Sequence, residues 1–113
     1  MGLDSYAMNR DGKCLTKEQE SLFEGINLCG GLFSGNGGSF RGKVYNSFIQ
    51  EISGVSLYSE MLEVCEVTCI KEALEDHLAN GNPLVDVSED TVSNLLRFFK
   101  VCDENDLVVG GWW

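Results

Sequence analysis

Apolar side chains recur every three or four residues in three long stretches of the chain, which is the period of an amphipathic helix. Each stretch therefore predicts one helix with a buried stripe. The stripes are Val44, Tyr45, Phe48, Ile49 and Ile52 within residues 43–53, Val67, Ile70, Leu74 and Leu78 within residues 66–79, and Val92, Leu95, Leu96, Phe99 and Cys102 in the helix that Ser88 is expected to cap. The last stripe is the widest, so we expect the third helix to cross the centre of the core.

Short apolar runs bounded by turn residues predict the strands. Residues 2–8 form a first strand, which the turn sequence Asn9-Arg10-Asp11-Gly12 ends. Residues 26–33 predict a second strand, bent at its paired glycines, and residues 84–87 are extended. The apolar residues 107–113 predict a last strand. We expect it to pair beside the first, because an apolar strand left unpaired would invite aggregation.

The segments between these elements are shorter. A short helix is expected within Leu15–Gly25, because Thr16 and Gln19 fit a capping box. Residues 55–67 fit a strand or the start of a helix equally well, and residues 103–106 predict a polar turn. The fold class that follows is α+β: a small, largely antiparallel sheet packed against three or four helices.

Size and composition indicate one soluble domain. The chain has 113 residues, of which 43% are hydrophobic and 23% charged, as in ordinary globular proteins. No apolar run approaches the roughly 18 residues of a membrane helix, and residues 1–13 show no features of a secretory leader. The five cysteines, odd in number and without a Cys-x-x-Cys motif, favour free thiols. We therefore expect residues 1–113 to form a single domain in the cytoplasm.

The formal charge of −10 is distributed unevenly along the chain. Residues 1–58 contain six acids and five bases, whereas residues 59–113 contain twelve acids and three bases. Direct binding to nucleic acid is disfavoured, since phosphate contacts require clustered Lys and Arg. A basic protein partner fits this charge, and so does the simpler explanation that the acids only keep the protein soluble.

A glycine-rich loop precedes the helix expected over residues 43–53. Six of the 13 glycines lie between Gly30 and Gly42. Backbone amides and a helix N-terminus can bind an anion, so the candidate ligand-binding residues are Gly37, Gly38, Ser39, Arg41 and Lys43. The loop matches neither the P-loop nor the dinucleotide-binding pattern. The alternative is a tight connection whose glycines only satisfy backbone angles.

Cysteine and histidine allow two kinds of site on paper. Cys65 and Cys69 lie one helical turn apart, and with His77 and Cys102 they would supply four zinc ligands. A nucleophilic Cys29 would need His77, the single histidine, as its base. Buried free cysteine is the commoner alternative, and no Gly-x-Ser-x-Gly elbow is present. We expect no metal, no cofactor and no catalytic residue, and hence a protein that is not an enzyme.

Five residues are candidates for contact with a partner. Glu72, Glu75 and Asp76 point away from the apolar stripe of their predicted helix, where acids are commonly just solvated. Trp112 and Trp113 are candidates because tryptophan is enriched at interaction hot spots. The alternative is that one ring closes the core while the other is half covered. If both are exposed, a homodimer or a partner contact is expected.

The opening Met1-Gly2-Leu3-Asp4-Ser5-Tyr6, the loop Gly-Gly-Ser-Phe-Arg-Gly-Lys-Val-Tyr and the Gly-Trp-Trp ending resemble a set of small uncharacterised bacterial and phage proteins. The resemblance covers most of the chain. It implies a bacterial or phage cytoplasmic setting, and it carries over no activity and no site residue.

Two functions fit the sequence. The first is a non-enzymatic acidic protein that binds a basic protein partner, such as a phage-type inhibitor or regulator. The second is a binding module for a nucleotide or another phosphorylated small molecule, which would use the glycine-rich loop at residues 35–43. The two functions place the site in opposite halves of the chain.

Overall fold

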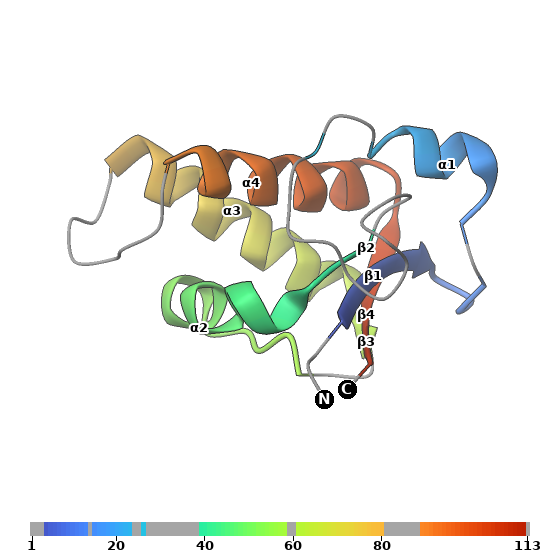
Figure 1. Cartoon of the computed structure of the whole chain (residues 1–113), viewed down its shortest axis with the longest axis horizontal. Helices are drawn as coiled ribbons and strands as arrows, with labels where there is room; N and C mark the ends of the chain where they lie inside the picture. Colours follow the sequence, from blue (N-terminus) through green and yellow to red (C-terminus); the bar gives the residue numbers. More distant parts are fainter. Residues whose placement is uncertain are drawn as a thin grey trace.

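The computed structural model describes residues 4–13, 15–23, 26, 39–58, 61–80 and 89–112 (Figure 1). Along the chain the elements are β1 (Asp4–Asn9), α1 (Lys17–Ser21), β2 (Ser39–Phe40), α2 (Gly42–Ser53), β3 (Met61–Leu62), α3 (Val64–Asn80), α4 (Glu89–Glu104) and β4 (Leu107–Trp112). The α+β fold class is therefore confirmed.

The sheet has the strand order β2-β1-β4-β3, and each of its pairings is antiparallel. The first strand lies beside the last over its whole length, from Asp4 opposite Trp112 to Asn9 opposite Leu107. This confirms the predicted pairing. The two-residue strand β2 lies in the part of the chain that was predicted to be a loop, and it pairs with β1 through Ser5 and Phe40.

Both faces of the central strands are covered. Ala7, Leu107 and Val109 alternate onto one face and belong to the hydrophobic core. Met8 and Val108 point to the opposite face and are also buried. The helices α2, α3 and α4 pack against the strands, and α3 lies between α2 and α4 (Figure 1).

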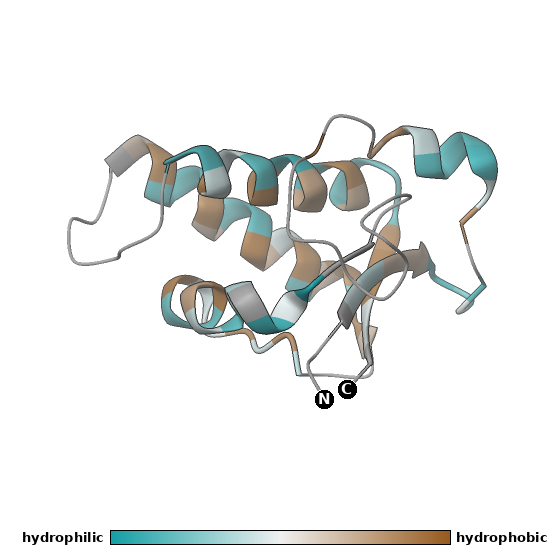
Figure 2. Cartoon of the chain, in the orientation of Figure 1, coloured by the Kyte–Doolittle hydropathy of each residue, from teal (hydrophilic) through white to brown (hydrophobic). Residues whose placement is uncertain are grey.

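The helices contribute the apolar faces that the sequence predicts, with one addition. On α3, Val67, Ile70 and Leu74 are fully buried, and in Figure 2 the hydrophobic stretches of α3 and α4 face the interior. On α4 the buried arc is wider than predicted, because Asn94 and Phe98 are buried as well. The ring of Phe98 contacts that of Phe23, with the ring centroids 4.9 Å apart, so the segment after α1 also contributes to the core.

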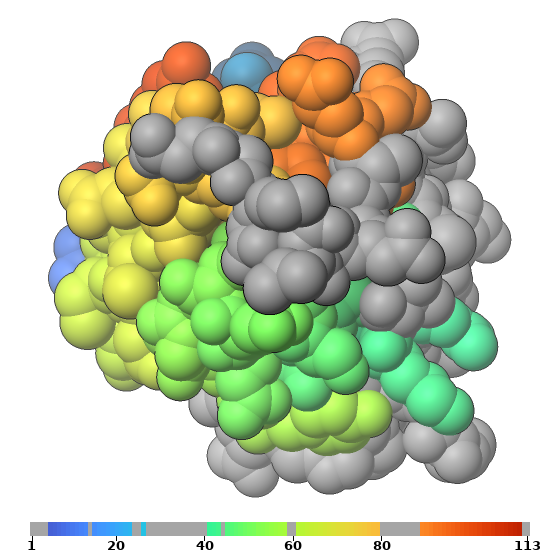
Figure 3. Space-filling model, turned by 90° about the vertical axis from the view of Figure 1, so that its left-hand side faces the viewer, coloured from blue at the N-terminus to red at the C-terminus, as the bar shows by residue number. Residues whose placement is uncertain are grey.

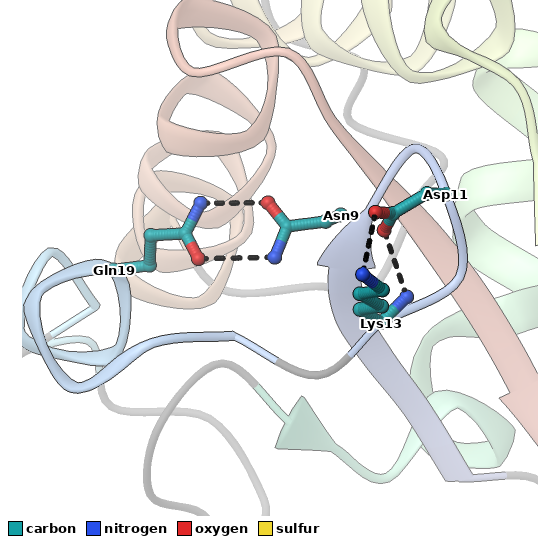
Figure 4. Close-up of polar contacts among 4 residues, drawn as sticks. All are labelled: Asn9, Asp11, Lys13 and Gln19. Atoms are coloured by element: carbon teal, nitrogen blue, oxygen red, sulfur yellow. Dashed lines mark hydrogen bonds and ion pairs between the residues drawn. The ribbon is translucent and has the colours of Figure 1, made fainter.

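The ends of α1 and α2 follow their sequence signals. The capping box at Thr16 and Gln19 is present, and the Gln19 amide also exchanges two hydrogen bonds with the Asn9 amide at the end of β1 (Figure 4). This pair holds the five-residue helix against the sheet. Gly54 ends α2 with φ of 77°, the left-handed conformation that favours glycine.

Two boundaries differ from the prediction. The helix α3 begins at Val64, so the ambiguous segment 55–67 divides into an irregular part, the short strand β3 and the first turn of α3. The helix α4 continues to Glu104, so the turn predicted over residues 103–106 is reduced to Asn105 and Asp106. Polar residues suit the last turn of a helix as well as a loop, which is why their pattern placed the boundary too early.

Several predictions lie outside the described residues. These are the strand predicted over residues 26–33, of which only Ile26 is described, the extended segment 84–87 and the cap at Ser88. Among the helices that are described, none is both long and apolar enough to cross a lipid bilayer.

Candidate functional site

The three acids singled out on α3 form one exposed surface, which we call the acidic face of α3. Glu72, Glu75 and Asp76 are all exposed, whereas the opposite side of the same helix is buried in the core. Their spacing of three and four residues makes them neighbours on the helix surface. In the space-filling view of Figure 3, the surface of α3 (yellow) lies directly beside that of α2 (green).

The single lysine of α3, Lys71, is directed toward α4. Lys71 Nζ lies 3.1 Å from Asp103 Oδ2 and 3.6 Å from Glu75 Oε1. Thr68 donates a hydrogen bond to the second oxygen of Asp103. The cation is therefore shared between Glu75 and the contact between α3 and α4.

This contact shifts the ionisation of its members. The hydrogen bond from Thr68 lowers the pKa of Asp103 below its ordinary value, and Lys71 adds to the effect against the opposing cost of burial. The hydrogen bond to Asp103 raises the pKa of Lys71. The sequence could not predict that Thr68, Lys71 and Asp103 lie together, because it does not reveal how α3 and α4 are rotated against each other.

The exposed side of α4 has mixed charge, unlike that of α3. Its exposed ionisable residues are Glu89, Asp90, Arg97, Lys100 and Glu104. The acids of the second half of the chain are therefore not presented equally by both helices. On α3 the exposed charged residues are Glu72, Glu75 and Asp76, which makes this helix the candidate surface for a basic partner.

The glycine-rich loop is described only at its end. Gly37 and Gly38 lie outside the described residues, and Ser39 is the first residue of β2. Arg41 is the N-cap of α2, and its side chain makes no capping hydrogen bond. Arg41 and Lys43 are both exposed, and no acid lies in the first turn of α2. The helix dipole and two cations thus coincide at this point.

One buried hydroxyl lies close to the start of α2 in the fold. Ser5 is opposite Phe40 in the β1–β2 pair, and Phe40 directly precedes Arg41, the N-cap of α2. Its side chain is fully buried, and its Oγ atom has no hydrogen-bond partner among the described residues. This group could not be predicted from the sequence, since a serine in a strand usually bonds to the backbone or to water.

The cysteines and the histidine do not assemble into the set of four ligands. Cys102 is fully buried in α4, whereas Cys65 and Cys69 are exposed on α3. The ring of His77 packs edge-on against that of Phe48, with the centroids 5.1 Å apart. Within the described ranges, no group of three or more His, Cys, Asp and Glu side chains is placed to hold a metal ion. Burial also raises the pKa of the Cys102 thiol, which disfavours its reactive thiolate.

Of the two tryptophans, one lies within the described residues. Trp112 is the last residue of β4 and pairs with Asp4, while Trp113 lies outside the described residues, as does Cys29. The expectation that the tryptophan rings contact a partner stays a prediction.

Comparison with known proteins identifies no relative: no protein family, no curated protein and no solved structure matches this chain. The resemblance of its opening and its glycine-rich loop to small bacterial and phage proteins also stays a prediction.

Proposed function

We propose that this protein is a non-enzymatic interaction protein whose acidic face of α3 binds a basic protein partner. What supports the proposal is the placement of Glu72, Glu75 and Asp76, exposed together on a helix whose opposite side is anchored in the core. A surface on a packed helix holds its charges in a fixed arrangement. It can therefore select a partner with a matching spacing of Lys and Arg.

The charge arrangement on α3 has an energetic cost that such a partner would remove. Glu72 and Asp76 lie four residues apart, and like charges at this spacing destabilise a helix by about 0.2–0.5 kcal/mol. Lys71 on the same helix makes ion pairs with Glu75 and Asp103. A cation from a partner placed between Glu72 and Asp76 would relieve this repulsion.

The class of partner follows from the sign of the charge. An acidic helix face repels nucleic acid but fits a protein groove that is itself built for phosphates. The proposal therefore extends to an inhibitor or regulator of a nucleic-acid-binding protein. Nucleic acid and this chain would then compete for the same surface of the partner.

The test is affinity capture from the source cells, followed by measurement of the dissociation constant with the purified partner. One variant neutralises the acidic face of α3 with Glu72→Gln, Glu75→Gln and Asp76→Asn. The matched control carries the same charge change on three other helices, with Glu18→Gln, Glu51→Gln and Glu104→Gln, all at exposed positions.

We expect the first variant to weaken binding by about tenfold or more and the control to change it little, because exposed charge contacts are each worth a few tenths to 1 kcal/mol. Binding should also weaken steeply as salt is raised. A partner that binds both variants equally, or that binds unchanged in 1 M salt, would refute the proposal.

A second function is favoured by the N-terminus of α2. Arg41 occupies a position where Ser, Thr or Asp normally accepts hydrogen bonds from the first amides, and an arginine cannot accept them. An anionic ligand would satisfy those amides and pair with Arg41 and Lys43. The proposed ligand is a nucleotide or another phosphorylated small molecule.

This second function is tested by thermal shift in the presence of inorganic phosphate and nucleotides. A ligand present at 100 times its dissociation constant stabilises the folded state by about 2.7 kcal/mol. We expect a higher Tm for the wild type and a smaller shift for Arg41→Ala, with Arg97→Ala on α4 as the matched control. The same shift in Arg41→Ala, or none in any protein, would exclude the site.

A further inference from the structure

Two cysteine side chains lie in consecutive turns on the outside of α3. Cys65 and Cys69 are four residues apart and both are exposed. Side chains at this spacing are neighbours on the helix surface, with Cβ atoms about 5–6 Å apart. The Cys69 thiol also contacts the backbone carbonyl oxygen of Ser53 at the end of α2, at a distance of 3.8 Å.

This spacing is unsuitable for a disulfide within the helix. A disulfide requires Cβ atoms about 3.5–4.5 Å apart, which is closer than a regular helix brings them. The distance instead suits two sulfur atoms on either side of a metal ion. Two metal–thiolate bonds of about 2.3 Å placed in line separate the sulfurs by about 4.6 Å.

We propose that Cys65 and Cys69 form a binding site for one thiophilic cation with two-coordinate geometry, namely Cu(I). Thiolate sulfur is a soft ligand that selects Cu(I) over hard cations. Binding releases one proton from each thiol as two S–Cu bonds form, and the oxidation states of copper and sulfur do not change. The thiolate pair and the ion together carry one negative charge.

The surroundings favour low coordination. In the described part of the chain, no third His, Cys, Asp or Glu side chain is placed to join the two thiols around one ion. A four-coordinate zinc ion would therefore lack ligands here, whereas a linear Cu(I) complex needs two. Glu72 is exposed one turn beyond Cys69, and its charge attracts a cation without the need to ligate it.

This site is independent of the acidic face of α3 in its chemistry, because it depends on sulfur and not on carboxylates. The thiols also differ from Cys102, which is fully buried in the core. An ion held by two exposed thiolates stays open to a further sulfur ligand from another molecule. The site therefore fits reversible loading and release of the ion.

The test is an anaerobic titration of the reduced full chain with Cu(I), in competition with a coloured Cu(I) chelator. Cys14→Ser and Cys29→Ser are introduced in every protein, because those thiols could bind copper separately. We expect one equivalent of tightly bound Cu(I). Either Cys65→Ser or Cys69→Ser should weaken it by at least about 100-fold, since each removes one of two ligands.

A register control separates the geometry from the number of thiols. The double variant Cys69→Ser/Glu72→Cys keeps two thiols on α3 but places them seven residues apart, or about 10 Å along the helix. It should bind Cu(I) no better than Cys65→Ser. Glu72→Gln should retain the binding, which distinguishes this site from the acidic face of α3.

Three results would overturn the proposal. These are an affinity for Cu(I) that is the same in Cys65→Ser as in the parent, equally tight binding by the register control, and less than one equivalent bound by the parent. The three positions changed on α3 in these variants and controls, Cys65, Cys69 and Glu72, are exposed, so circular dichroism should show that these changes leave the fold intact.

Discussion

Gly110 in β4 shows how closely the outer face of the sheet is packed. A Cβ atom at this position would lie 2.8 Å from Cζ of Tyr6 and 3.0 Å from Cε of Met8. Both neighbours belong to β1, and Tyr6 is directly opposite Gly110 in the strand pair. Only a residue without a side chain leaves the tyrosine ring room to lie across the strand.

Gly110→Ala is therefore expected to destabilise the fold by about 1–3 kcal/mol, as overpacking commonly does. Urea unfolding measures the change. The matched control is Gly54→Ala, which has open space around it but a φ of 77°, and which should cost about 1–2 kcal/mol from backbone strain alone. Adding Tyr6→Leu should rescue Gly110→Ala and leave Gly54→Ala unchanged. If Tyr6→Leu rescues neither, the ring is not the cause.

Ser5 gives a prediction of opposite sign. A buried hydroxyl without a partner destabilises a protein by about 1–3 kcal/mol, and the Ser5 hydroxyl has none among the described residues. Ser5→Ala should therefore raise Tm by a few degrees in thermal unfolding. Ser21→Ala, at an exposed position in α1, serves as the comparison. A lower Tm for Ser5→Ala would mean that the hydroxyl is bonded in solution.

Neither of these two residue-scale features could be predicted from the sequence. The pairing of the first strand with the last was predictable from the apolar ends of the chain, but its register was not. Tyr6 meets Gly110 only in one register, because a slip of one residue would turn every side chain to the other face. Thr16 and Gln19, in contrast, act within one turn, so their capping box could be predicted directly.

The contact between α3 and α4 makes stability depend on pH. The pKa of Asp103 is lower in the folded protein than its ordinary value of 3.8, so the unfolded chain takes up a proton first as pH falls. The stabilisation by Thr68 and Lys71 is thus fully present above about pH 5. It is lost as the pH falls below 4 and through the folded-state pKa.

Asp103→Asn should accordingly lower Tm by a few degrees at pH 7, and its difference from the wild type should shrink toward zero below pH 3. Thermal unfolding monitored by circular dichroism across this range measures the change. Glu104→Gln, the exposed neighbour, should show no such convergence. A constant difference at all pH values would indicate that the asparagine acts through packing and not through charge.

Helices were more predictable than the strands between them. The stripes on α2, α3 and α4 repeat over several turns, so an error at one position does not hide the period. A single apolar stripe predicts one contact surface, whereas α4 is covered on more than one side. Phe98 was not predicted to be buried because it lies on a second contact surface, where it packs against Phe23. The two-residue strands β2 and β3 are too short to carry any period, and only their partners define them.

At the scale of the whole molecule, the central strand pair β1–β4 joins residues 98 positions apart at Asn9 and Leu107 and 108 positions apart at Asp4 and Trp112. Because β1 and β4 are the two central strands and pair along their whole length, we expect their amide hydrogens to exchange with the same opening free energy. This opening free energy should be the highest in the protein. Hydrogen exchange measured by mass spectrometry tests this expectation, with α1 as the element that exchanges early. Separate protection of β1 and β4 would show that the sheet opens one strand at a time.

For the proposed function, the sequence indicates only a bias in charge. The sequence places twelve acids among residues 59–113, and the fold presents Glu72, Glu75 and Asp76 together on α3 while α4 exposes both acids and bases. Which carboxylates lie together depends on helix rotation and packing. Composition alone gives no information about helix rotation or packing.

The pairing of β1 with β4 also governs how the protein is made. A ribosome releases β1 before β4, and the strand that pairs with it along its whole length emerges only after about 100 further residues have been made. During that interval β1 presents an unpaired edge with buried-type residues such as Ala7 and Met8. A message cut short before Leu107 would thus yield a product that cannot finish its sheet and that proteases and chaperones would treat as misfolded.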